Sequence, residues 1–116
     1  MHIQSNLNRP IDQISVNVIS KSWSGCKNKS WVSFHVNLGS TERPLMGIVS
    51  CWANKPNANL LASASTLYPG CRILLQNIVI TKSKFVSQNE QQANYVINLN
   101  HLEQLKIKWQ PKIKPN

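Results

Sequence analysis

Aromatic rings and cations occur close together at two places in the sequence. Trp23 precedes Lys27 and Lys29 in one segment, and Lys84 is followed directly by Phe85 in another. Flat rings stack on exposed bases and ammonium groups neutralise phosphates, so this combination of residue types is typical of surfaces that bind single-stranded nucleic acid. The elements that would position these residues therefore decide whether such a surface can form.

The charge of the chain favours a polyanionic partner. Thirteen Lys and Arg residues face four Asp and Glu, which gives 116 residues a formal net charge of +9. Nucleic acid is the first expectation and an anionic membrane surface the second. With so few carboxylates, a multi-metal site or a two-carboxylate glycosidase site is very hard to assemble.

Catalytic and metal-binding patterns are missing from the sequence. The three histidines (His2, His35 and His101) are far apart, and four glycines form no phosphate-binding loop. Three cysteines with long gaps predict neither a disulfide framework nor a zinc ribbon, which favours a reducing compartment. We expect no enzyme activity, no cofactor and no metal; a cysteine nucleophile with His35 as base is the catalytic alternative left open.

Alternating apolar residues predict a small all-β domain. The clearest strand has Val32, Phe34 and Val36 on one side, with Trp31 and His35 on the other. A helix is expected over 57–67, between the third and fourth strands, and a Pro-Gly turn follows it. We expect a flexible arm over 1–10, a domain over 11–109 and a basic flexible tail over 110–116. The predicted strands cover roughly 12–20, 31–38, 45–53, 71–81, 95–99 and 105–109.

This order of elements is that of the OB-fold, a five- to six-stranded Greek-key barrel. The stretches 46–54, 60–65 and 67–78 together resemble single-stranded-DNA-binding OB domains, in which a strand ending in an aromatic residue leads to a helix and then to a glycine turn. The candidates are the bacterial single-stranded-DNA-binding protein, primosomal replication protein B and domains of the replication protein A type. The chain ends in basic residues and not in an acidic tip, which makes it more similar to the second and third of these.

The resemblance implies binding of single-stranded DNA with little sequence preference, in replication restart, repair or recombination. It also implies a helicase, a recombinase or another replication protein as partner, and a homodimer. The chain has no apolar stretch long enough to span a membrane, so we expect a soluble protein whose partner is nucleic acid and not a membrane. The expected location is cytoplasmic and nucleoid-associated in a bacterium, or nuclear in a eukaryote.

Ten residues are the candidate contacts. The resemblance places Trp52 where related proteins stack a base, whereas a reversed strand phase would put Trp52 in the core. For Trp31 the alternative is that it caps one end of the barrel. The full set of nucleic-acid-binding candidates is Trp23, Lys27, Lys29, Trp31, His35, Trp52, Lys55, Lys82, Lys84 and Phe85.

Two other functions remain as alternatives. An RNA-binding OB domain would need the same rings and cations. An OB-fold subunit that serves mainly to dock proteins of a DNA-maintenance complex would need neither.

Overall fold

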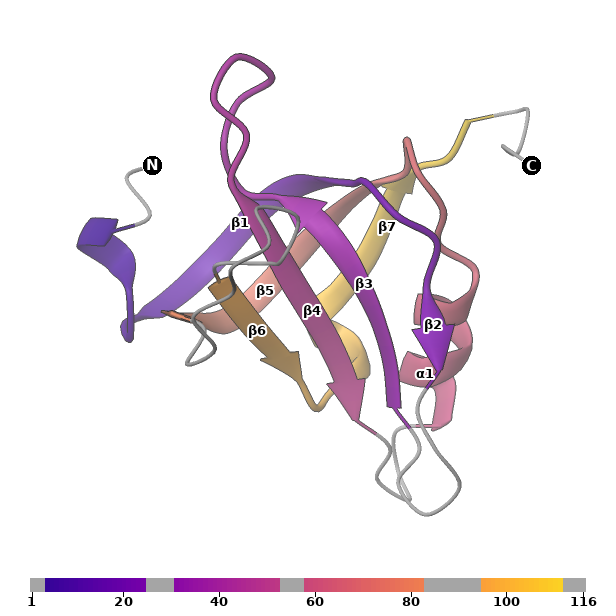
Figure 1. Cartoon of the computed structure of the whole chain (residues 1–116). Helices are drawn as coiled ribbons and strands as arrows, with labels where there is room; N and C mark the ends of the chain where they lie inside the picture. The colour runs from indigo at the N-terminus through magenta and orange to yellow at the C-terminus, as the bar shows by residue number, and fades with distance from the viewer. Residues whose placement is uncertain (1–3, 25–30, 53–57, 83–94, 112–116) are drawn as a thin grey trace.

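The computed structural model describes residues 4–24, 31–52, 58–82 and 95–111. Seven strands, one α-helix and two short 3-10 helices are present in these ranges (Figure 1). In chain order they are η1 (Gln4–Asn6), β1 (Pro10–Val18), β2 (Trp23–Ser24), β3 (Trp31–Asn37), β4 (Met46–Trp52), α1 (Ala58–Ser65), β5 (Arg72–Lys82), β6 (Tyr95–Leu99), η3 (Leu102–Gln104) and β7 (Leu105–Trp109).

Five of the strands close into a barrel. The sheet runs β1-β3-β4-β6-β5, and β5 pairs again with β1 to complete the circle. All of these pairings are antiparallel except β4 with β6, which is parallel. With α1 between β4 and β5, the molecule is an all-β, OB-like barrel with one short helix, as the sequence predicted.

The strand β5 is long enough to serve two neighbours on one of its edges. Its end pairs with β6, from Ile80 to Lys82, and its beginning pairs with β7, from Arg72 to Leu75. Between these two stretches Asn77 has a left-handed backbone, with φ of 52°. The helix η3 lies opposite this bend, and the Gln104 amide donates a hydrogen bond of 2.8 Å to the Asn77 carbonyl oxygen. β6 and β7 therefore continue one another along β5.

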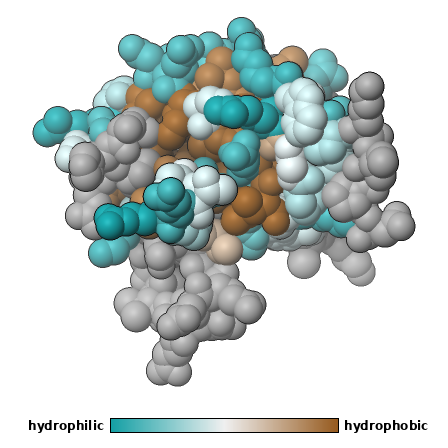
Figure 2. All heavy atoms as spheres, turned by 90° about the horizontal axis from the view of Figure 1, so that it is seen from above, coloured by the Kyte–Doolittle hydropathy of each residue, from teal (hydrophilic) through white to brown (hydrophobic). Residues whose placement is uncertain are grey.

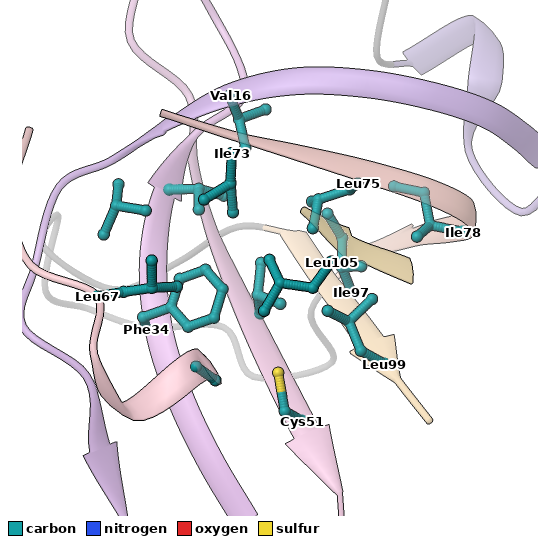
Figure 3. Close-up of a cluster of buried hydrophobic side chains, with 14 of the residues drawn as sticks. Val16, Phe34, Cys51, Leu67, Ile73, Leu75, Ile78, Ile97, Leu99 and Leu105 are labelled. Carbon is teal, nitrogen blue, oxygen red and sulfur yellow. The ribbon is translucent and has the colours of Figure 1, made fainter. Parts of the chain in front are cut away.

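The interior of the barrel is apolar. Side chains from β3, β4, β5 and β6 point into it together with those of α1 and the segment that follows, as Figure 3 shows around Phe34. Phe34, Val49, Ile73 and Ile97 are completely buried. Burial of this many large side chains is the main stabilising contribution in a domain of this size.

A tight turn after α1 starts β5. Gly70 has φ of +100°, a conformation that side-chain-bearing residues rarely adopt, and its N–H donates to the Val18 carbonyl oxygen at 3.0 Å. The turn therefore ties the start of β5 to the end of β1, which is the closing seam of the barrel.

Several boundaries differ from the expectation. β1 begins at Pro10, earlier than predicted. The segment before it, predicted to be a flexible arm, is attached to the barrel, because Leu7 packs against the core and the Asn8 N–H donates to the Ile80 carbonyl oxygen. β2 was not predicted, since two residues are too short for an alternating pattern. At the other end, the Tyr68 hydroxyl donates to the carbonyl oxygen of Pro111, within the predicted tail.

The surface is mixed. Seen from above, hydrophilic residues cover most of the molecule, and hydrophobic residues reach the surface between them (Figure 2). Within the described ranges, no helix has both the length and the apolar character needed to cross a membrane. Cys51 and Cys71 are buried free thiols.

Candidate nucleic-acid interface

Strand pairing brings three tryptophans to one side of the sheet. Trp31 of β3 is the direct partner of Trp52 of β4, and Trp23 of β2 is the partner of Ser33 of β3. Cross-strand partners point to the same side of a sheet. The neighbouring residues Val32, Phe34 and Val36 are buried in the core, so the tryptophans lie on the outer side. We call Trp23, Trp31, His35 and Trp52 the tryptophan face.

The rings of this face form two pairs. The centroids of Trp31 and Trp52 are 5.9 Å apart with an interplanar angle of 34°. Those of Trp23 and His35 are 4.9 Å apart with an angle of 48°. Trp23 and Trp52 are 38% and 37% exposed, whereas Trp31 and His35 are half-buried. Each pair thus combines one open ring with one supporting ring.

A hydrogen bond orients the open ring of Trp52. Its indole N–H donates to the Asn98 side-chain oxygen of β6 at 3.0 Å. Asn98 is the residue that pairs with Ser50 in the parallel β4–β6 ladder, so it lies on the same outer side. The outward direction of Asn98 could be predicted from the sequence, because Asn98 alternates with the apolar Ile97 and Leu99. Only the strand order shows that its side chain reaches Trp52.

A buried polar contact lies between the two ring pairs. The hydroxyls of Ser33 and Ser50 are 3.0 Å apart, and Ser33 is only 1% exposed although it is on the outer side. The two small side chains satisfy each other's hydrogen-bonding groups under the rings. The floor of the tryptophan face is therefore uncharged and closely packed.

His35 contributes a neutral ring. Burial lowers the pKa of His35 from its ordinary value of 6.5, because the charged imidazolium loses hydration. Its backbone N–H donates to the Ser20 hydroxyl at 2.9 Å, which holds the end of β1 against β3. At neutral pH the histidine supports Trp23 as an aromatic surface and adds no cation.

The outer side of β3 and β4 carries no charged residue within the described ranges. Besides the aromatic residues it presents Asn37, Met46, Ile48 and Ser50. Cations for phosphate contacts would have to come from the segments beside it. The predicted cations Lys27, Lys29, Lys55 and Lys84 lie outside the described residues, as does the predicted stacking ring of Phe85.

Lys82 does not join the tryptophan face. It is the last residue of β5 and not part of a loop, and it pairs with Tyr95, which in turn pairs with Gly47. Trp52 is five residues further along β4, or about 17 Å at the usual rise of a strand. β5 thus extends one residue further than predicted, and Lys84 and Phe85, with which Lys82 was grouped, lie outside the described residues.

The two alternative positions for the tryptophans have different outcomes. Trp52 is not in the core, because Val49 and Cys51 fill the interior from the same strand. Trp31 is the first residue of β3; it is half-buried, and its ring packs beside that of Trp52. It covers part of the sheet and presents part of its ring.

Of the described cysteines, Cys51 does not share a site with His35. Cys51 points into the barrel and is completely buried, whereas His35 is on the outer side. Burial raises the pKa of the Cys51 thiol to about 12, which disfavours the nucleophilic thiolate. Cys26 lies outside the described residues. Across the described ranges, no three His, Cys, Asp or Glu residues gather in a group suited to a metal ion.

No family model and no curated protein matches this sequence. The case for a function therefore depends on the barrel and on the geometry of the tryptophan face.

Proposed function

We propose that this protein binds single-stranded DNA with little sequence preference, and that the tryptophan face is the surface on which bases stack. The observation that carries the proposal is the placement of Trp23, Trp31 and Trp52 together on the outer side of β2, β3 and β4. The corresponding side of OB-folds is the one that binds oligonucleotides.

The physical argument is that open tryptophans are costly without a partner. Trp23 and Trp52 each leave more than a third of their surface in water, although Cys51, the residue before Trp52 in β4, is completely buried. A base stacked on either ring would remove apolar area from water and add a stacking contact. Every base has such a flat face, so the binding would tolerate any sequence.

Phosphate neutralisation completes the proposal. The net charge of +9 supplies the cations, and in the sequence Lys29 is two residues from Trp31 and Lys55 three residues from Trp52. Because the described tryptophan face is uncharged, stacking and charge neutralisation are carried by different residues. They can be separated by mutation.

The experiment is a fluorescence anisotropy titration with labelled poly-dT, poly-U and duplex DNA. We expect poly-dT to bind more tightly than the duplex, since a duplex hides its base faces. Trp52→Ala and Trp23→Ala should each weaken binding to poly-dT by about 1–3 kcal/mol per stacked base. The control is Leu102→Ala, an exposed apolar residue of η3 outside this face.

The outcomes separate the alternatives. Tighter binding to poly-U than to poly-dT would favour an RNA-binding domain. Absence of binding to all three ligands would refute the proposal and favour a subunit that docks proteins. Equal losses for the tryptophan variants and the Leu102→Ala control would show that the tryptophan face is not the binding surface.

A further inference from the structure

A second group of exposed rings and cations lies on β7. Four of its five residues, from Lys106 to Trp109, are exposed. Trp109 is 59% exposed, the largest value among the exposed large hydrophobic residues of the described chain. Nothing in the tryptophan face accounts for this residue, because β7 pairs with β5 and not with β3 or β4.

The pairing of β7 with β5 shows which side these residues occupy. Ile73 and Leu75 of β5 are completely buried, so Arg72 and Leu74 point outward. Lys106 pairs with Leu74, and Trp109 pairs with Arg72 after a register shift. Since partners share a side, Lys106 and Trp109 point outward with Arg72. We call these three residues, together with the exposed Lys108 at the register shift, the β5–β7 patch.

The patch has the charge that the tryptophan face lacks. Three of its four members are cations, and within the described ranges none of them forms an ion pair with a carboxylate. Arg72 is held in place by a hydrogen bond of 3.1 Å from its Nε to the Ser15 hydroxyl of β1. A fixed guanidinium, two ammonium groups and an open indole are the groups that bind phosphates and stack a base.

We propose that the β5–β7 patch is a second contact site for the same single strand, separate from the tryptophan face. This inference rests on the proposed function. In Figure 1, β3 and β4 cross the front of the barrel while β5 and β7 lie behind them, so a DNA strand that reaches both surfaces must pass around the barrel. Short DNA strands would then occupy one surface, and longer DNA strands would occupy both.

Two other partners for the β5–β7 patch fit its residues less well. A second copy of the chain paired edge to edge along β7 would bring Lys106 and Lys108 against the same lysines, which is unfavourable. An acidic extended peptide could pair with the strand edge, but it would make no particular use of an outward indole beside a guanidinium. The acidic peptide is therefore an outcome that the experiment must separate.

The test compares two lengths of oligothymidylate on the full chain. One ligand has about 6 nucleotides and the other about 30, on either side of the usual site size of one OB-fold. Trp109→Ala should weaken binding of the long ligand at least five-fold and leave the short ligand nearly unchanged. Lys106→Ala with Lys108→Ala should lower the salt slope for the long ligand by about 1.4, at roughly 0.7 per phosphate contact.

The matched control is Arg9→Ala with Arg43→Ala, which removes the same charge at exposed positions away from β7. An equal loss in this control would overturn the proposal, since net charge alone would then explain the effect. The proposal is also overturned if the β7 variants bind both lengths of oligothymidylate like the parent. Poly-glutamate serves as the probe for an acidic peptide, and a loss of affinity for poly-glutamate alone would overturn the proposal as well. If the parent itself does not bind the long ligand, the proposed function is refuted instead. If the parent binds and only the tryptophan variants weaken that binding, the proposed function stands and the second site alone is refuted.

Discussion

At the scale of single residues, the tryptophan face combines open rings with supports that hold them. Trp52 donates to Asn98, and Trp23 rests on a neutral histidine. Such support restricts ring motion before a ligand arrives, which lowers the ordering cost of binding. Two predictions concern these supports.

The first prediction is that Asn98→Ala weakens binding of single-stranded DNA without unfolding the protein. The side chain accepts the indole hydrogen bond of Trp52 at an exposed position, so its removal frees the ring and costs little stability. A hydrogen bond of this kind contributes about 0.5–1.5 kcal/mol, which corresponds to a two- to ten-fold loss of affinity. The measurement is anisotropy with poly-dT beside a thermal melt.

Val96→Ala is the control, because Val96 is half-buried on the same strand and lies on the same side as Asn98. The supporting role of Asn98 would be disproved if both variants bound as the parent does, or if both lost affinity equally.

The second prediction concerns pH. The pKa of His35 is lowered in the folded protein, so below its ordinary value the unfolded chain binds a proton that the folded chain refuses. The free energy of unfolding should therefore be highest above pH 6.5 and fall as the pH drops through 6.5 toward the lowered pKa. Urea denaturation at pH 7.5 and about 5.5 measures this difference, above the range in which carboxyl groups titrate.

His35→Phe keeps a ring beside Trp23 and removes the titrating group, so its stability should change less between the two pH values. A steeper dependence in the His35→Phe variant would contradict the assignment.

At the scale of elements, η3 connects β6 to β7 and allows both strands to pair with the same edge of β5. Gln104 of η3 makes three hydrogen bonds there. The side-chain oxygen of Gln104 accepts from the backbone N–H groups of Asn100 and His101, and its side-chain amide donates to the Asn77 carbonyl oxygen. The bend of β5 at Asn77 and the turn from β6 to β7 are thus held by one side chain. The placement of the β5–β7 patch depends on it.

We predict that Gln104→Ala lowers the free energy of unfolding by about 1–3 kcal/mol, since it removes three hydrogen bonds at a partly exposed site. Gln104→Glu keeps the two accepted bonds and loses only the donated one, so its loss should be smaller. Denaturant unfolding of both variants checks the order. Equal stability of the alanine variant and the parent would show that the turn is held by other contacts.

At the scale of the whole molecule, the two aromatic surfaces differ in charge: the described tryptophan face is uncharged, whereas Trp109 lies beside cations. The described tryptophan face has no charged residue, whereas Arg72, Lys106 and Lys108 gather near β7. Stacking and charge neutralisation should therefore respond to different changes in solution conditions.

We predict that affinity for poly-dT falls with salt at a log-log slope of about −3 to −4, which corresponds to about four to six neutralised phosphates. Trp52→Ala should reduce affinity at every salt concentration and leave this slope unchanged, because Trp52 carries no charge. The measurement is anisotropy at several salt concentrations. A parent slope near zero would mean that the net charge serves another purpose.

The sequence alone determined the parts of the fold that depend on local pattern. Strict alternation around Phe34 predicted both the strand and its buried side, and the small residues Val49 and Cys51 still face the core as that alternation requires. The helix and the Pro-Gly turn followed from spacing and from the conformational freedom of Gly70. The OB-like order of these elements was predictable because each one is specified by its own neighbours in the chain.

Only the tertiary structure decided which of these residues meet. The pairing of Trp31 with Trp52, the reach of Asn98 to Trp52 and the position of Trp23 over His35 all depend on strand register and on the parallel β4–β6 ladder. Register is a long-range property, set where the whole barrel closes, and no local spacing encodes it. For the same reason the sequence predicted a loop beginning at Lys82, whereas pairing with Tyr95 extends β5 through this residue.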